Sequence, residues 1–258
     1  MLHLPADRFP TPPAPALRPV LGLILLYFVL QAVVGFVVAL LIGLGARLLR
    51  GPADVAALMS RPDLTSTTVI ATLLGAGLIT LRLAHAFWPR QWSQARPPGL
   101  GFVAPAPRYV AAAVLLGLAM PYLGGWLTSL LARDHAVPQD VKELGGQASL
   151  GLRIALTLTV ASIGPLVEEL LFRGVLLSAL LRHLRAFWAA LASAALFALV
   201  HLPDLCWLWY ALPNLVLLGL ALAWLRLRAG SLWPSVIAHG CNNLVAMLAM
   251  FVSLHQPG

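Results

Sequence analysis

Long apolar segments dominate this sequence of 258 residues and constrain its fold more than any other feature. A helix that crosses the hydrocarbon of a bilayer needs about 20 mainly apolar residues. The predicted spans are residues 19–46, 66–87, 109–132, 152–181, 186–202, 205–227 and 231–254. The fifth is short enough to enter the membrane without fully crossing it. The sequence therefore predicts an all-α, polytopic transmembrane helical bundle of about seven spans, surrounded by the lipid bilayer.

The composition excludes a soluble fold and argues against a nucleic-acid partner. The chain is 60% hydrophobic and 10% charged, so too few polar side chains are available to cover the surface of a soluble domain. The formal net charge is +8, but most Lys and Arg residues lie between the apolar runs rather than in one basic patch. This distribution is typical of topology signals, and no nucleic-acid partner is predicted.

The Lys and Arg residues of the loops predict the orientation of the chain, because short basic loops face the cytoplasm. The N-terminus and even-numbered loops carry the larger set, Arg8, Arg18, Arg82, Arg90, Arg96, Arg108, Arg182, Arg185, Arg226 and Arg228, and the odd-numbered loops carry Arg47, Arg50, Arg61, Arg133, Lys142 and Arg153. Residues 1–18 are Pro-rich and are expected to be an uncleaved cytoplasmic tail. Residues 19–149 are expected to hold the N-terminal transmembrane helices, and residues 255–258 a C-terminal tail.

Glu168 and Glu169 are the only carboxylates well inside an apolar run, in the stretch GPLVEELLFRGV. Burying a carboxylate in hydrocarbon costs several kcal/mol or more unless the group is paired or neutralised. Arg173 lies four residues after Glu169, so the two share one helix face and can form an ion pair. Glu168 is rotated by about 100° from Glu169 on a helix and therefore needs another partner.

Two other apolar segments supply polar residues that can meet Glu168. His201 ends the fifth predicted span, one turn after Phe197, and His239 and Asn243 lie four residues apart on one face of the seventh. Polar residues in spans normally face the bundle interior, so these side chains are expected to converge with Glu168 on one buried site. A Glu with a His can hold and deprotonate a water molecule, and a His/Asn pair can donate hydrogen bonds to a developing oxyanion.

The order of these motifs resembles that of the CPBP family of intramembrane proteases, which includes the type-II CAAX prenyl proteases and the bacteriocin-processing and Abi-like self-immunity proteins. The motifs are Glu168-Glu169-x-x-x-Arg173, Phe197-x-x-x-His201 and His239-x-x-x-Asn243. Each one alone is weak, but the three together on separate apolar segments are specific. The resemblance covers about residues 150–250 and predicts a protease core over residues 150–254.

By this resemblance the polar residues receive expected roles, with a membrane-bound or lipidated peptide as substrate. Glu168 and His201 are expected to activate water, and His239 and Asn243 to stabilise the oxyanion. Glu169 and Arg173 are expected to be a pair that supports the site. The family has been described both as metalloproteases and as glutamate proteases. If a divalent metal such as zinc is present, its expected ligands are Glu168, His201 and His239. Asn242 points to a different helix face from Asn243 and is expected to pack or hydrogen-bond.

Other classes of function stay open beside the protease. A proton-coupled transporter also uses buried Glu and His residues as relays, although repeated halves with broken helices are not evident here. A non-catalytic self-immunity or partner-binding protein would keep the motifs. A Glu–Arg pair inside a membrane can also have the purely structural role of holding helices together. The sequence has no His-Glu-x-x-His and no Gly-x-Ser-x-Gly motif. The Ala-, Leu-, Arg- and Pro-rich composition and the lack of an organelle signal favour a bacterial inner membrane.

Overall fold

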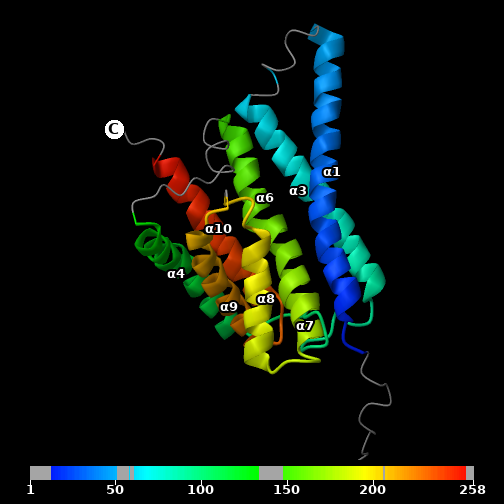
Figure 1. The fold of residues 1–258 in the computed structure, drawn as a ribbon, viewed down its shortest axis with the longest axis vertical. Coiled ribbons are helices and arrows are strands. Elements are labelled where there is room, and N and C mark those ends of the chain that lie inside the picture. Colours follow the sequence, from blue (N-terminus) through cyan, green and yellow to red (C-terminus); the bar gives the residue numbers. More distant parts are fainter. Residues whose placement is uncertain (1–12, 51–57, 59–60, 134–147, 206, 254–258) are drawn as a thin grey trace, which may run out of the picture.

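The structure is a computed structural model that describes residues 13–50, 58, 61–133, 148–205 and 207–253. Over these ranges the elements are helices joined by short turns and loops, which confirms the predicted all-α bundle (Figure 1). The first twelve residues of the predicted cytoplasmic tail and the predicted C-terminal tail, residues 255–258, lie outside the described residues.

The helices follow the predicted spans closely. They are α1 (Leu17–Arg50), α3 (Pro62–Phe87), α4 (Pro107–Ala132), α6 (Leu150–Glu169), the π-helix η2 (Leu170–Leu176), α7 (Leu177–Leu180), α8 (Ala186–Val200), the 3₁₀ turn η3 (Trp209–Ala211), α9 (Leu212–Ala229) and α10 (Trp233–Ser253). Within the described ranges, 6 helical stretches are long and apolar enough to cross a membrane, one of them running through α6, η2 and α7. The fifth predicted segment is α8, which has 15 residues and is too short to count among them.

Proline and glycine set several of the helix ends. Pro62 and Pro107 begin α3 and α4, where the fixed φ of proline suits the first helical turn and its missing N–H costs nothing. Gly230 ends α9 with a φ of 66°, a left-handed conformation that favours glycine, and its N–H donates to the carbonyl of Arg226. These residues fix the positions at which the helices begin and end.

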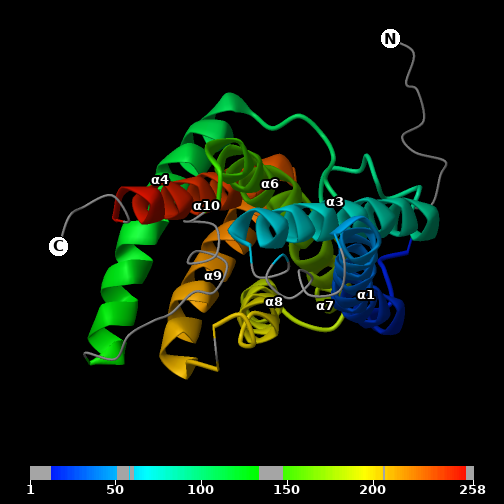
Figure 2. The same ribbon diagram turned by 90° about the horizontal axis from the view of Figure 1, so that it is seen from above.

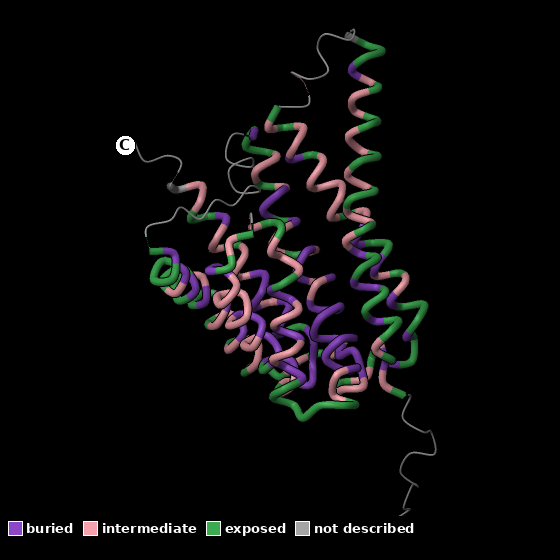
Figure 3. Tube along the Cα trace, in the orientation of Figure 1, coloured by how far each residue is buried: buried purple, intermediate pink, exposed green. Residues whose placement is uncertain are grey.

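The packing of the bundle places one helix at its centre. Seen from two directions, α4 and α10 lie on one side and α1 and α3 on the other, with α6 between them (Figures 1 and 2). The continuation of α6 into η2 contacts α1, α8 and α9. Every residue of η2 is buried, and the buried part of the chain is concentrated around it (Figure 3). The stretch that carries the two glutamates and the arginine is thus the core of the molecule.

The π-helical turn η2 is stabilised by a neighbouring helix. A π-helix bonds each N–H to the carbonyl five residues earlier, and here the N–H of Leu177 donates to the carbonyl of Phe172. Ser193 of α8 donates a second hydrogen bond to the same carbonyl, with Oγ 2.8 Å from the oxygen. The rings of Phe172 and Phe197 also pack edge to face at 5.3 Å. These contacts join α8 to the widened turn directly after Glu169.

Arg226, which was counted among the loop arginines, is a helix residue in the structure. It lies in the last turn of α9 and is fully buried. Its Nη1 donates to the carbonyl of Ala95 at 2.9 Å, and its Nη2 donates to that of Gly99 at 2.6 Å. A buried guanidinium needs such acceptors, so Arg226 ties the loop between α3 and α4 to α9 instead of acting as a topology signal. The predicted orientation in the membrane therefore loses one of its ten supporting arginines and stays a prediction.

Candidate active site

The predicted ion pair between Glu169 and Arg173 is present and completely buried. Arg173 Nη1 lies 2.8 Å from Glu169 Oε1, and neither side chain is exposed to solvent. The guanidinium carbon also lies 4.4 Å from the centre of the Phe197 ring, a cation–π contact. The carbonyl of Gly219 accepts a longer hydrogen bond from Nη2 at 3.4 Å. Three different elements therefore hold the arginine.

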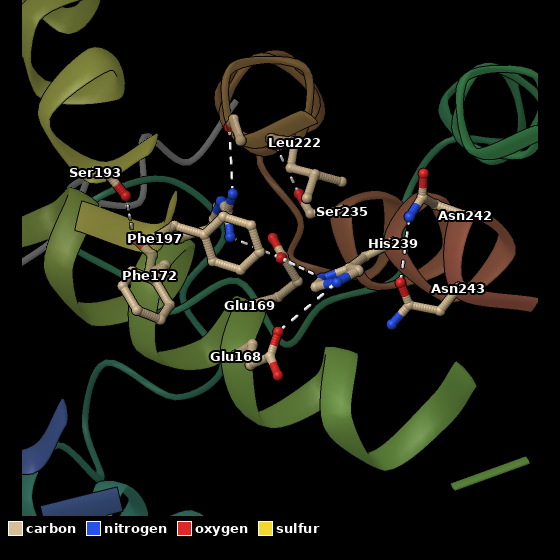
Figure 4. A network of polar contacts seen from close by, with 12 residues as sticks. Glu168, Glu169, Phe172, Ser193, Phe197, Leu222, Ser235, His239, Asn242 and Asn243 are labelled. Carbon is tan, nitrogen blue, oxygen red and sulfur yellow. Dashed lines mark hydrogen bonds and ion pairs between the residues drawn. The ribbon is translucent and has the colours of Figure 1, made fainter. Parts of the chain in front are cut away.

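Glu168 faces two histidines from two other helices. Its Oε2 lies 3.8 Å from His201 Nε2 and 3.7 Å from His239 Nε2, so the predicted meeting of these three side chains is confirmed (Figure 4 shows Glu168 and His239). Glu168 is 17% exposed and His201 23% exposed, whereas His239 is only 4% exposed. The site is thus open on the side of Glu168 and His201 and closed on the side of Glu169 and Arg173.

The Nδ1 atoms of both histidines are engaged by acceptors. His201 Nδ1 lies 2.7 Å from the carbonyl oxygen of Phe197, and His239 Nδ1 lies 2.9 Å from Glu169 Oε1. A carbonyl or carboxylate oxygen only accepts, so each Nδ1 carries a hydrogen. Both Nε2 atoms are consequently the nitrogens that face Glu168. The second role of Glu169, as the acceptor for His239, was not predicted from the sequence.

Phe197 contributes more than the spacing of its motif indicated. Besides offering its carbonyl to His201, it places its ring 4.6 Å from the His201 ring and 5.6 Å from the His239 ring. The same ring covers Arg173. One aromatic side chain therefore contacts the arginine of the buried ion pair and both imidazoles. Its position four residues before His201 is the only signal in the sequence that points to it.

The close approach of α10 to α6 depends on a break in the hydrogen bonds of α6. Pro165 lies inside α6 and has no N–H, so the carbonyl of Ala161, four residues earlier, loses its helical donor. Gly240 of α10 packs directly against this carbonyl, and a Cβ at that position would overlap with it. Asn243 also donates from Nδ2 to the carbonyl of Val160, at 3.0 Å. These contacts bring His239 beside the two glutamates.

Gly240→Ala is therefore expected to push α10 away from α6. Overlap with a backbone oxygen cannot be relieved by a rotamer change, and overpacking of this kind costs about 1–3 kcal/mol. Gly125→Ala in α4 is the matched control, because nothing lies within 4 Å of a Cβ there. Thermal unfolding in detergent should show a lower midpoint for Gly240→Ala and an unchanged or higher one for Gly125→Ala, since Ala is the better helix former. Equal midpoints for the two variants would contradict this account of the α6–α10 contact.

Asn243, the fourth predicted residue, lies one turn of α10 beyond His239. Its side chain bonds to Val160 rather than to any of the other three predicted residues. Its Oδ1 accepts a hydrogen bond from Asn242 Nδ2 at 3.2 Å (Figure 4). One N–H of its amide group is thus used by α6 while the nitrogen carries a second hydrogen. Asn242 hydrogen-bonds, in line with one of the two expectations for it.

Glu168 lies farther from the two predicted histidine ligands than the ligands of a tetrahedral zinc ion lie from one another. Glu168 Oε2 lies 3.7 and 3.8 Å from the two imidazole nitrogens, whereas ligands at about 2.0 Å from a tetrahedral zinc are about 3.3 Å apart. Within the part of the chain that the structure describes, no three His, Cys, Asp or Glu side chains are grouped as a metal ion requires.

Comparison with known proteins points to one family for the C-terminal part. Residues 150–245 match the family model described as "Type II CAAX prenyl endopeptidase Rce1-like". A protein of Bacillus subtilis (strain 168) with the printed name "Putative membrane peptidase YdiL" is 32% identical over 99 residues, which are 37% of this chain and 37% of that protein. The match therefore spans well under two thirds of the relative. No solved structure matches the chain. Residues 150–245 are thus similar to the type II CAAX prenyl endopeptidases, in agreement with the resemblance noted from the order of the three motifs.

Proposed function

We propose that this chain is an intramembrane endopeptidase that hydrolyses a peptide bond in a membrane-bound or lipidated peptide. The observation that carries the proposal is the convergence of two imidazole Nε2 atoms on one carboxylate oxygen of Glu168. Both Nδ1 atoms donate to acceptors, and these hydrogen bonds hold the two rings with their Nε2 atoms towards Glu168. The family match over residues 150–245 and the similarity to a protein named as a membrane peptidase support the same activity.

A water molecule between Glu168 and His201 is the proposed nucleophile. The 3.8 Å between Oε2 and Nε2 is too long for a hydrogen bond, yet it leaves a position about 2.8 Å from both atoms. Both atoms are acceptors, so the water donates one hydrogen to each and keeps a lone pair for attack. These two side chains are also the more exposed members of the site, which gives water a route to them.

His239 is the proposed donor to the oxyanion. Glu168, Glu169 and Arg173 together carry one net negative charge in a largely buried site, which is unfavourable in a low dielectric. In the proposed donor form, His239 carries a hydrogen on each ring nitrogen. Its Nδ1–H is then held by Glu169 Oε1, and its Nε2–H is available to a substrate oxygen. The second N–H of Asn243 is the proposed partner donor on the same helix face.

The proposed reaction needs no group beyond these side chains and water. The water oxygen attacks the carbonyl carbon of the peptide while Glu168 takes one of its protons. Negative charge develops on the carbonyl oxygen and is stabilised by His239 and Asn243. The tetrahedral intermediate then collapses with rupture of the carbon–nitrogen bond, and Glu168 returns its proton to the leaving nitrogen. The products are a carboxylic acid and an amine.

Purified protein in liposomes should cleave transmembrane or prenylated peptides at a defined bond, as detected by mass spectrometry of the products. His183→Ala is the control variant, because His183 is exposed in the turn after α7 and should leave the rate unchanged. A metal chelator is expected to leave the rate unchanged as well. Activity that is lost on chelation and restored by zinc would replace the metal-free mechanism. Proton uptake into the liposomes without any cleavage would favour the transporter alternative instead.

A further inference from the structure

Asn242 and Asn243 form a pair of neighbouring amides on α10 whose hydrogen bonds run in one direction. Asn242 Nδ2 donates to Asn243 Oδ1 at 3.2 Å, and Asn243 Nδ2 donates to the carbonyl of Val160 at 3.0 Å. Figure 4 shows the two side chains next to His239, with the nitrogen of Asn242 directed at the oxygen of Asn243. Both residues are partly buried, so water competes only partly for these bonds.

The two partners of Asn243 select one of two orientations of its amide group. A backbone carbonyl only accepts hydrogen bonds, so the atom that faces Val160 must be the nitrogen. The atom that faces Asn242 Nδ2 must then be the oxygen. The two ends of an amide have almost the same size and shape, and packing alone therefore distinguishes them poorly. With its own nitrogen facing Asn243, as in the structure, Asn242 adds to the preference for the orientation with the Asn243 nitrogen towards α6.

We propose that Asn242 is a positioning residue that fixes the amide of Asn243 with its nitrogen towards α6 and the substrate. The inference rests on the proposed function, in which Asn243 donates to the oxyanion. A turned amide would present its oxygen to the developing negative charge and would repel it. Asn242 thus acts on the reaction through Asn243 and touches no reacting atom.

The test compares Asn242→Asp with Asn242→Ala. Aspartate has the shape of asparagine but, when ionised, carries two acceptors and no donor, so it repels Asn243 Oδ1 and favours the turned amide. The expected loss in kcat is about tenfold to a hundredfold for Asn242→Asp and a few-fold for Asn242→Ala. KM should change less than twofold in both, because the oxyanion exists only after the substrate is bound. Asn214→Asp on α9, beside Gly124 of α4, is the control for placing a new carboxylate in the bundle.

A double-mutant cycle with Asn243→Ala shows whether Asn242 acts through Asn243. Once Asn243 has lost its amide, Asn242→Asp should reduce kcat no further. Losses that multiply in the double variant would overturn the inference, and so would wild-type kcat in both Asn242 variants. In those outcomes the wild-type protein still cleaves, and the proposed function survives. Absence of cleavage by the wild-type protein would overturn both. If Asn242→Asp fails to fold, the cycle is run with Asn242→Ala.

Discussion

Glu168→Gln is expected to lower kcat by about 10²–10⁴-fold while the protein stays folded. The amide keeps the shape of the side chain but cannot take a proton from water. Glu168 is also the more exposed of the two glutamates, so its neutral replacement leaves no buried charge without a partner.

The measurement is kcat on a cleaved membrane peptide beside the thermal unfolding midpoint in the same detergent. Asp63→Asn is the matched control, because Asp63 is an exposed carboxylate in the first turn of α3 that accepts a hydrogen bond from the N–H of Ser149. It undergoes the same chemical change outside the site and should keep wild-type kcat. Near wild-type cleavage by Glu168→Gln, or inactivity that merely follows unfolding, would make the carboxylate structural and remove the centre of the mechanism.

Arg173→Ala is expected to act on stability first, with a loss of about 3–5 kcal/mol in the free energy of unfolding. Glu169 and Arg173 are both fully buried, so removing the guanidinium leaves the carboxylate with His239 as its one remaining hydrogen-bond partner among the described residues. The substitution also removes the cation above the Phe197 ring and empties space in the core. Folded yield should therefore fall before any effect on kcat can be measured.

Two further variants make this prediction specific to the buried charge. Arg153→Ala is the control, because Arg153 is a partly buried arginine in the first turn of α6 that donates from Nε to the carbonyl of Ala148. Arg153→Ala should lower the free energy of unfolding far less than Arg173→Ala does. The double variant Glu169→Gln with Arg173→Met removes both charges and should recover part of the lost stability. An unfolding midpoint for Arg173→Ala as high as that for Arg153→Ala would contradict the proposed cost of an unpaired carboxylate.

The parts of the site that could be predicted from the sequence are those set by short-range geometry. Glu169 and Arg173 are four residues apart on one helix, so their ion pair follows from helical periodicity alone. The spans follow from the length of the apolar runs. The meeting of Glu168 with His201 and His239 required a second argument, that polar groups in a membrane must face one another rather than lipid.

The contacts that were not predicted depend on how distant helices dock. The hydrogen bond between His239 and Glu169 joins residues 70 apart in sequence, and it exists because α10 settles on the carbonyl that Pro165 leaves free in α6. Arg226 was counted among the loop arginines, whereas in the structure it is a helix residue that donates to two carbonyls of the loop between α3 and α4. Spans that are apolar on all sides carry no periodic signal for which face meets which neighbour.

The shortness of α8 has a consequence for the lipid around the molecule. At 1.5 Å per residue its 15 residues measure about 22 Å, against about 30 Å for the hydrocarbon of a typical bilayer. An exposed tryptophan lies near each end of α8, Trp188 in its first turn and Trp207 after its last residue. Tryptophan side chains favour the boundary between lipid and water. α8 is thus about 8 Å shorter than the hydrocarbon, and such a segment is accommodated by local thinning of the bilayer or by entering it without crossing. His201 directly follows α8 and is partly exposed, as is Glu168, so the short helix places one end of the candidate site nearer to the membrane surface than a full-length span would.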